Sequence, residues 1–182
     1  MFKRICFYGA PGAGKTTLTH DVFVSSKKSK KNCEVVSELA REWAYLNRPI
    51  QSMDQVFLFA SQLHREDTLL SRSKVDFVIT DSPIILNSYY GYKCDPGLYD
   101  SYISFARRFD EKYPALHFFC PVNPSYKFDT EGRFHSAEDA KKISEEMLNY
   151  LYTYLNPSEL TILSNENRLD TVLEILAKNK IM

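Results

Sequence analysis

The residues of this 182-residue chain best suited to chemistry form a glycine-rich stretch near its start, with the pattern G-x-x-x-x-G-K-[ST]. Backbone N–H groups of such a loop converge on phosphate oxygens. The lysine of the pattern reaches the β- and γ-phosphates, and the serine or threonine that follows it coordinates Mg²⁺ through its hydroxyl group. We therefore expect this loop to bind ATP and Mg²⁺, and Lys15 to act in catalysis. The predicted loop consists of Gly9, Ala10, Pro11, Gly12, Ala13, Gly14, Lys15, Thr16 and Thr17.

Two acidic residues follow segments that are predicted to form strands. Glu38 comes shortly after residues 33–36, and Asp81 comes directly after a β-branched and aromatic run, residues 75–80. In open α/β sheets, ligands bind beyond the carboxyl ends of the strands. Asp81 is suited to hold Mg²⁺ with Thr16 or to act as a base near the γ-phosphate, and helix capping is its ordinary structural role. We expect Glu38 or Asp81 to orient an acceptor hydroxyl in catalysis, and the sequence leaves open which one.

A long segment without a helix or strand pattern, residues 122–136, contains Arg133. Segments of this length are commonly functional, and we expect this one to be a lid. A lid that closes excludes water, and its arginine neutralises charge on a phosphoryl group during transfer. Arg133 is therefore a predicted catalytic residue.

Three further polar side chains are candidates for binding the substrate together with Glu38. Arg41 lies close to Glu38 in the sequence. Gln62 and Arg65 lie on the less apolar face of a helix predicted over residues 52–71. Plain solvent exposure is the alternative for this helical pair.

The elements that position these residues alternate along the chain. One strand precedes the glycine loop, and a helix follows from residue 14 or 15 to residue 24, before a basic loop at 25–32. Such alternation predicts a mostly parallel five-stranded sheet with helices on both faces, and we expect an α/β P-loop NTPase fold in one domain, residues 1–182, with a lid segment. The remaining strands are predicted at 33–36, 75–80, 115–121 and 160–163, and the remaining helices at 37–44, 52–71, around 99–109, 136–155 and 169–176.

Composition narrows the class of partner. Lys plus Arg and Asp plus Glu both number 23, so the formal net charge is zero and no overall positive field attracts duplex nucleic acid. The sequence has no signal-peptide pattern and no apolar run long enough to cross a bilayer. We expect a cytoplasmic protein that does not contact membranes, and the sequence carries no marker of oligomeric state.

Five stretches together resemble the NadR-like kinases, a family of small P-loop kinases of the AAA type. Its best-understood members phosphorylate nicotinamide riboside. The resemblance covers most of the chain, although only the glycine loop is a specific motif. At residues 38–41 the chain has Glu-Leu-Ala-Arg, where the riboside kinases have an acidic, an aromatic, a glycine and an arginine residue. The stretches are residues 9–17, 37–42, 54–62, 79–82 and 131–133.

The resemblance implies a role for each matching residue. Lys15 and Thr16 take the ATP and Mg²⁺ positions, and Glu38 and Arg41 take those of an acidic and basic pair after the second strand. Asp81 and Arg133 then correspond to the carboxylate after the third strand and to the lid arginine. These implied roles agree with those argued from the residues themselves.

The function expected from the sequence is an ATP- and Mg²⁺-dependent kinase. Its acceptor is a small nucleoside-type molecule such as a nucleoside, a nucleotide or nicotinamide riboside. A first alternative is a kinase of a nucleic-acid hydroxyl, at a 5′ end or on a modified base, with Lys27 to Lys31 and Arg107-Arg108 on the backbone. A second alternative is a regulatory ATPase without an acceptor. A switch GTPase is not expected, because the sequence lacks an Asn-Lys-x-Asp element that reads guanine.

Overall fold

The structure is a computed structural model that describes residues 2–51, 53–123 and 137–182. Five strands form one sheet in the order β2-β3-β1-β4-β5, and each neighbouring pair is parallel. This arrangement confirms the sheet predicted from the sequence. The strands are β1 (Arg4–Tyr8), β2 (Cys33–Val36), β3 (Phe77–Thr80), β4 (Ala115–Phe119) and β5 (Leu160–Ile162).

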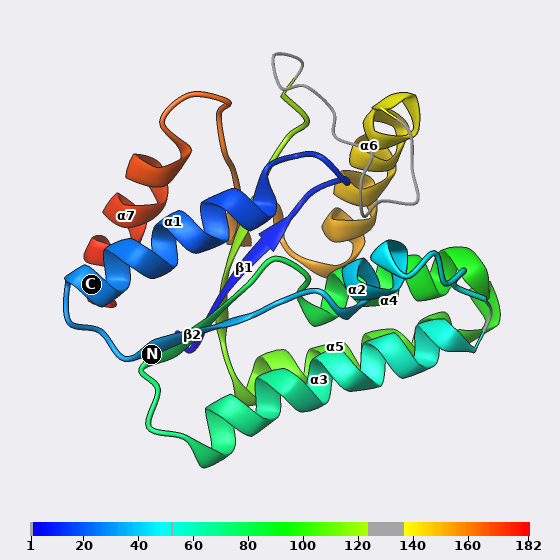
Figure 1. Cartoon of the computed structure of the whole chain (residues 1–182), viewed down its shortest axis with the longest axis horizontal. Helices are drawn as coiled ribbons and strands as arrows, with labels where there is room; N and C mark the ends of the chain where they lie inside the picture. The colour runs from blue at the N-terminus through cyan, green and yellow to red at the C-terminus, as the bar shows by residue number, and fades with distance from the viewer. Residues whose placement is uncertain (1, 52, 124–136) are drawn as a thin grey trace.

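Helices cover both faces of the sheet (Figure 1). α1 and α7 pack on one face, and α3, α4, α5 and α6 pack on the other. None of the helices in the described ranges is both long and apolar enough to cross a lipid bilayer. The helices are α1 (Lys15–Lys28), α2 (Leu39–Tyr45), α3 (Asp54–Arg72), α4 (Ile84–Cys94), α5 (Tyr99–Lys112), α6 (Ala137–Tyr154) and α7 (Arg168–Lys178), with short 3₁₀ turns at Pro96–Leu98 and Pro157–Glu159.

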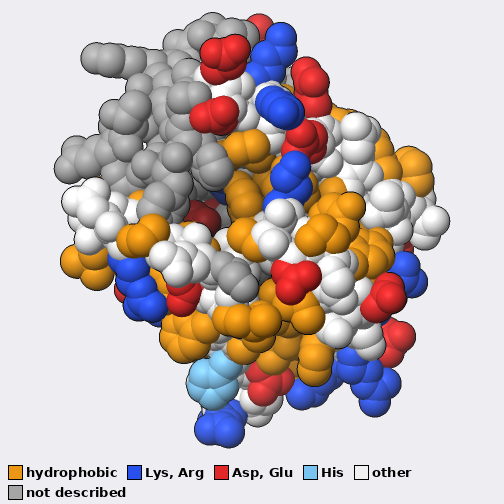
Figure 2. Space-filling view, turned by 90° about the vertical axis from the view of Figure 1, so that its right-hand side faces the viewer, with side chains coloured by type: hydrophobic (Ala, Val, Ile, Leu, Met, Phe, Trp, Pro, Cys, Tyr) orange, Lys and Arg blue, Asp and Glu red, His pale blue; other side chains and the backbone are white. Residues whose placement is uncertain are grey.

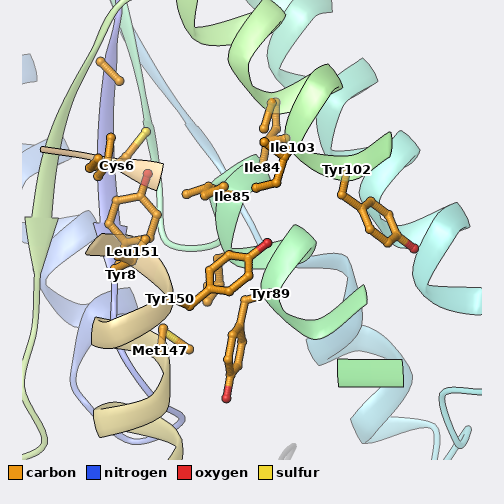
Figure 3. Packing of buried hydrophobic residues seen from close by; sticks show 14 of the residues in the cluster. Cys6, Tyr8, Ile84, Ile85, Tyr89, Tyr102, Ile103, Met147, Tyr150 and Leu151 are labelled. Atoms are coloured by element: carbon orange, nitrogen blue, oxygen red, sulfur yellow. The ribbon is translucent and has the colours of Figure 1, made fainter. Parts of the chain in front are cut away.

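β1 is buried on both faces, which explains why its sequence after Arg4 is a continuous apolar and aromatic run rather than an alternating one. Ile5 and Phe7 belong to the core under α1 and α7, whereas Cys6 and Tyr8 belong to the core on the other face. Figure 3 shows this second core, in which Leu151 of α6 lies close to Tyr8. Burial of each large side chain contributes about 1.5–3 kcal/mol, so β1 is held firmly where the glycine loop begins.

Between β3 and β4 the structure has two helices, α4 and α5, where the sequence predicted one. They pack closely because Gly91 of α4 has no side chain. A Cβ atom at this position would lie 2.5 Å from the ring of Tyr102 in α5. The sequence of α4 shows no clear helical period because the helix is rich in tyrosine and is buried on most sides.

α1 is also longer than predicted, and it includes the first residues of the expected basic loop. Ser26 is buried, and its hydroxyl donates to the carbonyl of Val22. Lys27 and Lys28 lie in the last turn of the helix, where positive charge interacts favourably with the helix dipole.

A cluster of charged side chains is buried at the amino end of the sheet. Arg4 is 1% exposed and donates to Glu66, to Asp110 and to the carbonyl of Tyr113. Its guanidinium also lies 4.8 Å from the centre of the Phe109 ring. Here each buried charge has an opposite charge beside it, which offsets the cost of desolvation.

His117 of β4 makes the stability of the fold depend on pH. Burial lowers the pKa of His117 from 6.5 to about 4, and its Nδ1 atom is paired with the hydroxyl of Tyr8 at 2.8 Å. Between these two pH values the unfolded chain binds a proton that the folded protein does not, so stability falls as pH decreases. The slope contributed by one such group is about 1.4 kcal/mol per pH unit.

We predict that His117→Asn makes the free energy of unfolding less dependent on pH between pH 6.5 and 4.5, because the contribution of His117 to the slope is lost. This holds whatever the effect of the substitution on the absolute stability. Urea unfolding at several pH values measures it. His64→Asn, at an exposed position of α3, is the matched control and should keep the slope of the unmodified protein. Equal slopes for the two variants would contradict the assignment to His117.

Candidate active site

The glycine loop has a backbone that only glycine adopts without strain at two critical positions. Gly9 has φ 142°, and a Cβ atom there would lie 2.4 Å from the carbonyl oxygen of Cys120. Gly14 has φ 84° and caps the amino end of α1 in the left-handed conformation. The loop therefore passes directly against the end of β4 and leads into the amino end of α1, where backbone N–H groups can bind an anion.

Lys15 is held at the loop itself. Its ammonium group donates to the carbonyls of Gly9 and Ala10, at 2.8 and 3.1 Å. Both acceptors are neutral, so the charge of Lys15 is not cancelled by these contacts. The ammonium group of Lys15 is therefore placed to bind a phosphate group at this loop.

Thr16 and Asp81, predicted as a metal-binding pair, are in direct contact. The Thr16 hydroxyl donates to Oδ2 of Asp81 at 2.6 Å, and Arg41 donates to the same hydroxyl oxygen at 3.2 Å. Asp81 is 4% exposed, and its Oδ1 atom is buried without a hydrogen-bond partner among the described residues. Mg²⁺ is commonly bound by one or two protein oxygens together with phosphates and water. The donor set of Thr16 and Asp81 fits such an ion.

A cavity of about 600 Å³ extends from the glycine loop to α4, and its size is typical of small-molecule sites. Gly12, Gly14 and Thr17 line its loop end, together with Lys15 and Thr16. Glu38 and Arg41 line it on the side of α2. The structure thus brings most of the predicted loop and the predicted acidic and basic pair to one cavity. Figure 2 shows the face that carries α2 and the start of α3, where hydrophobic side chains gather.

Glu38 has the perturbed carboxyl group of the cavity. Burial raises the pKa of Glu38, the charge of Asp81 raises it further, and Lys15 and Arg41 lower it. Tyr90 of α4 lines the same cavity, and burial, with an added contribution from Glu38, raises the pKa of its phenol. A carboxyl group with a raised pKa and a phenol with a raised pKa are suited to proton transfer and hydrogen bonding.

Several residues of the cavity were not predicted from the sequence. Gln55 of α3, Asn87 and Lys93 of α4, and Tyr90 line its far end. Asn87 also donates to the carbonyl and hydroxyl oxygens of Ser82, which steadies the turn after Asp81. For the residues of α4, the signal in the sequence is the run of tyrosines at 89, 90 and 92, since aromatic rings can line a pocket as well as a core.

Gln62 and Arg65 are not among the described residues that line the cavity. Gln62 is 1% exposed, and its amide donates to Glu66 at 2.9 Å and to Thr80 at 3.1 Å. Arg65 donates to the carbonyl of Ser37 on the outer side of the protein. The polar groups of these two side chains are engaged outside the cavity, and substrate binding by them stays a prediction.

Of the predicted lid, residues 124–136 lie outside the described residues. Arg133 is among them, so its catalytic role stays a prediction.

Solved structures with a similar fold include a NadR protein and two kinases. A NadR protein in complex with NR has a TM-score of 0.74 and 17% identity to this chain. The match covers 97% of this chain and 51% of the NadR protein, so this chain spans about half the length of the NadR protein. Deoxyadenosine kinase from M. mycoides, with dCMP and dCDP bound, has a TM-score of 0.53 and 17% identity, over 98% of this chain and 100% of that one.

A variant of the APS kinase CysC of Mycobacterium tuberculosis has a TM-score of 0.54 and 14% identity, over 100% of this chain and 99% of that one. These similarities confirm the predicted P-loop NTPase fold. No curated protein matches the sequence. A family model described as an AAA domain matches residues 4–166, and this chain therefore belongs to that AAA domain family.

Proposed function

We propose that this protein is an ATP- and Mg²⁺-dependent kinase that phosphorylates a hydroxyl group of a small nucleoside-type acceptor. The observation that carries the proposal is that the phosphate loop and Glu38 line one cavity with room for a second molecule. The fold shared with a NadR protein, a deoxyadenosine kinase and an APS kinase supports the same class of reaction. The proposal treats residues 1–182 as one kinase domain that acts in the cytoplasm, with residues 122–136 as its lid.

In the proposed reaction, the loop amides and Lys15 hold the phosphate tail of ATP. Bound Mg²⁺ neutralises charge on the β- and γ-phosphates, and Thr16 and Asp81 are the residues suited to hold it. The acceptor oxygen attacks the γ-phosphorus, the bond to the oxygen that bridges to the β-phosphate breaks, and Glu38 takes the acceptor proton. Since Asp81 is already engaged with Thr16, Glu38 is the better candidate for the base.

Contacts of the basic side chains give less support to the nucleic-acid alternative. Lys27 pairs with Glu34 at 3.1 Å, and Arg108 pairs with Glu111 at 3.4 Å. The guanidinium of Arg107 lies 5.5 Å from the centre of the Tyr154 ring. These three side chains are on the surface and already have partners, which favours the proposal of a small-molecule acceptor.

The reaction itself is tested with labelled ATP and a panel of nucleosides, nucleotides and nicotinamide riboside. We expect one of these acceptors to be phosphorylated. ATP turnover without any phosphorylated acceptor would instead favour the regulatory ATPase, and retention on single-stranded DNA that falls steeply with salt would favour the nucleic-acid kinase.

We predict that Glu38→Gln lowers kcat by roughly 100- to 10,000-fold, the range for loss of a general base, while ATP binding is kept. Because the pKa of Glu38 is raised, kcat/KM of the unmodified enzyme should rise with pH through that pKa, and the variant should lose this rise. Steady-state kinetics over a range of pH measure both effects. Glu42→Gln, at an exposed position of α2 one turn beyond Glu38, is the matched control. A normal pH profile for Glu38→Gln would contradict this role.

We also predict that Asp81→Asn weakens the Mg²⁺ dependence of ATP binding by roughly tenfold or more, because a charged oxygen ligand is lost. Binding of metal-free ATP should be little changed. Calorimetric titration with and without Mg²⁺ measures the difference, with Asp100→Asn on the surface of α5 as the control. The same Mg²⁺ effect in both variants would show that Asp81 does not hold the ion.

A further inference from the structure

Arg168, the first residue of α7, is 8% exposed and joins three separate loops at the carboxyl edge of the sheet. Its guanidinium donates to the carbonyl of Ala13 in the glycine loop and, at 2.6 Å, to that of Pro121 after β4. It also donates at 3.2 Å to the carbonyl of Ser164 after β5. A further bond reaches the side-chain oxygen of Asn165. Arg168 is not among the described residues that line the cavity, so it holds the glycine loop from behind.

The bond to Ala13 determines how the next amide group of the loop points. The carbonyl of Ala13 and the N–H of Gly14 belong to the same peptide unit, which is planar and trans, so they point in opposite directions. A carbonyl held towards Arg168 therefore turns the Gly14 N–H towards the cavity that Gly14 lines. That amide is one of those available to a phosphate oxygen at the start of α1.

The charge of Arg168 also differs from that of the other buried arginine. Arg4 pairs with two carboxylates, whereas no carboxylate lies within 4.0 Å of the Arg168 guanidinium in the part of the chain that the structure describes. A buried cation without an anion is costly unless an anion is supplied. Burial raises the pKa of the Cys120 thiol to about 11, and the charges of Arg168 and Lys15 both lower it. The two charges therefore lie near the same end of β4.

We propose that Arg168 is a positioning residue for the phosphate tail: it orients the Gly14 amide through Ala13 and adds a positive charge behind the loop. This inference rests on the proposed function in one respect, namely that the ligand of the loop is ATP. It predicts a loss of affinity that is specific to the phosphates.

The test measures the dissociation constants of ATP and of adenosine by calorimetry on the full chain. We expect Arg168→Met to weaken ATP binding roughly 10- to 100-fold, the range for loss of a charge-assisted hydrogen bond. Adenosine binding should change less than about twofold, since adenosine has no phosphate. Arg168→Lys keeps the charge but loses the planar fork, so its ATP affinity should lie between the two.

Arg4→Lys is the matched control, because it changes a second buried arginine far from the loop. It is expected to lower the melting temperature and to leave the ratio of ATP to adenosine affinity unchanged. Should Arg168→Met fail to fold in circular dichroism, Arg168→Lys carries the test by the same ratio. An unchanged ratio in the Arg168 variant, or an equal fall in Arg4→Lys, would overturn the inference. Unmodified protein that does not bind ATP would instead overturn the proposed function.

Discussion

The parallel pairing of β1 with β3 on one side and β4 on the other is the constraint on which the site depends. In this register Cys6 lies beside Thr80, and Tyr8 lies beside Phe119. The backbone pairing continues one step further, because the N–H of Cys120 donates to the carbonyl of Tyr8 at 2.8 Å. The glycine loop therefore begins in contact with the end of β4, while the end of β3 delivers its carboxylate to the start of α1. Both faces of β1 are buried and packed, so a shift in register by one residue would exchange the side chains of the two cores and disrupt the packing of both.

The two ends of the sheet differ in whether their positive side chains are paired with carboxylates. At the amino end, the positive charge of Arg4 is matched by two carboxylates, the buried Glu66 and the partly exposed Asp110. At the carboxyl end, Lys15 and Arg168 donate to neutral carbonyl oxygens and Arg41 donates to a hydroxyl group. Three cations thus gather near two carboxylates, Glu38 and Asp81, and leave a net positive charge. Such an excess stabilises a polyphosphate and is otherwise unfavourable for folding.

Local patterns predicted the parts of the site that depend on local structure. The glycine loop, Glu38 and Asp81 could be located because each follows a strand with a clear apolar run. Gln62 could not be assigned in this way. Gln55 and Gln62 are seven residues apart and lie on one buried stripe of α3, yet Gln55 reaches the cavity and Gln62 bonds to Thr80 in the interior. Seven residues correspond to about 10 Å along a helix, and only the docking of α3 against the sheet decides which part of the stripe meets the cavity.

Arg168 illustrates a different limit, since its contact with Ala13 joins residues 155 positions apart. No periodicity within α7 points to that contact. One local feature does set this residue apart: an arginine at the first position of a helix places positive charge at the positive end of the helix dipole. Residues that break a local preference need a compensating interaction elsewhere, and they are concentrated at functional sites. Here the compensation is a set of backbone carbonyl oxygens from loops that meet only in the folded sheet. An arginine at the first position of a helix, with no local partner to explain it, therefore indicates a tertiary contact such as the one between Arg168 and Ala13.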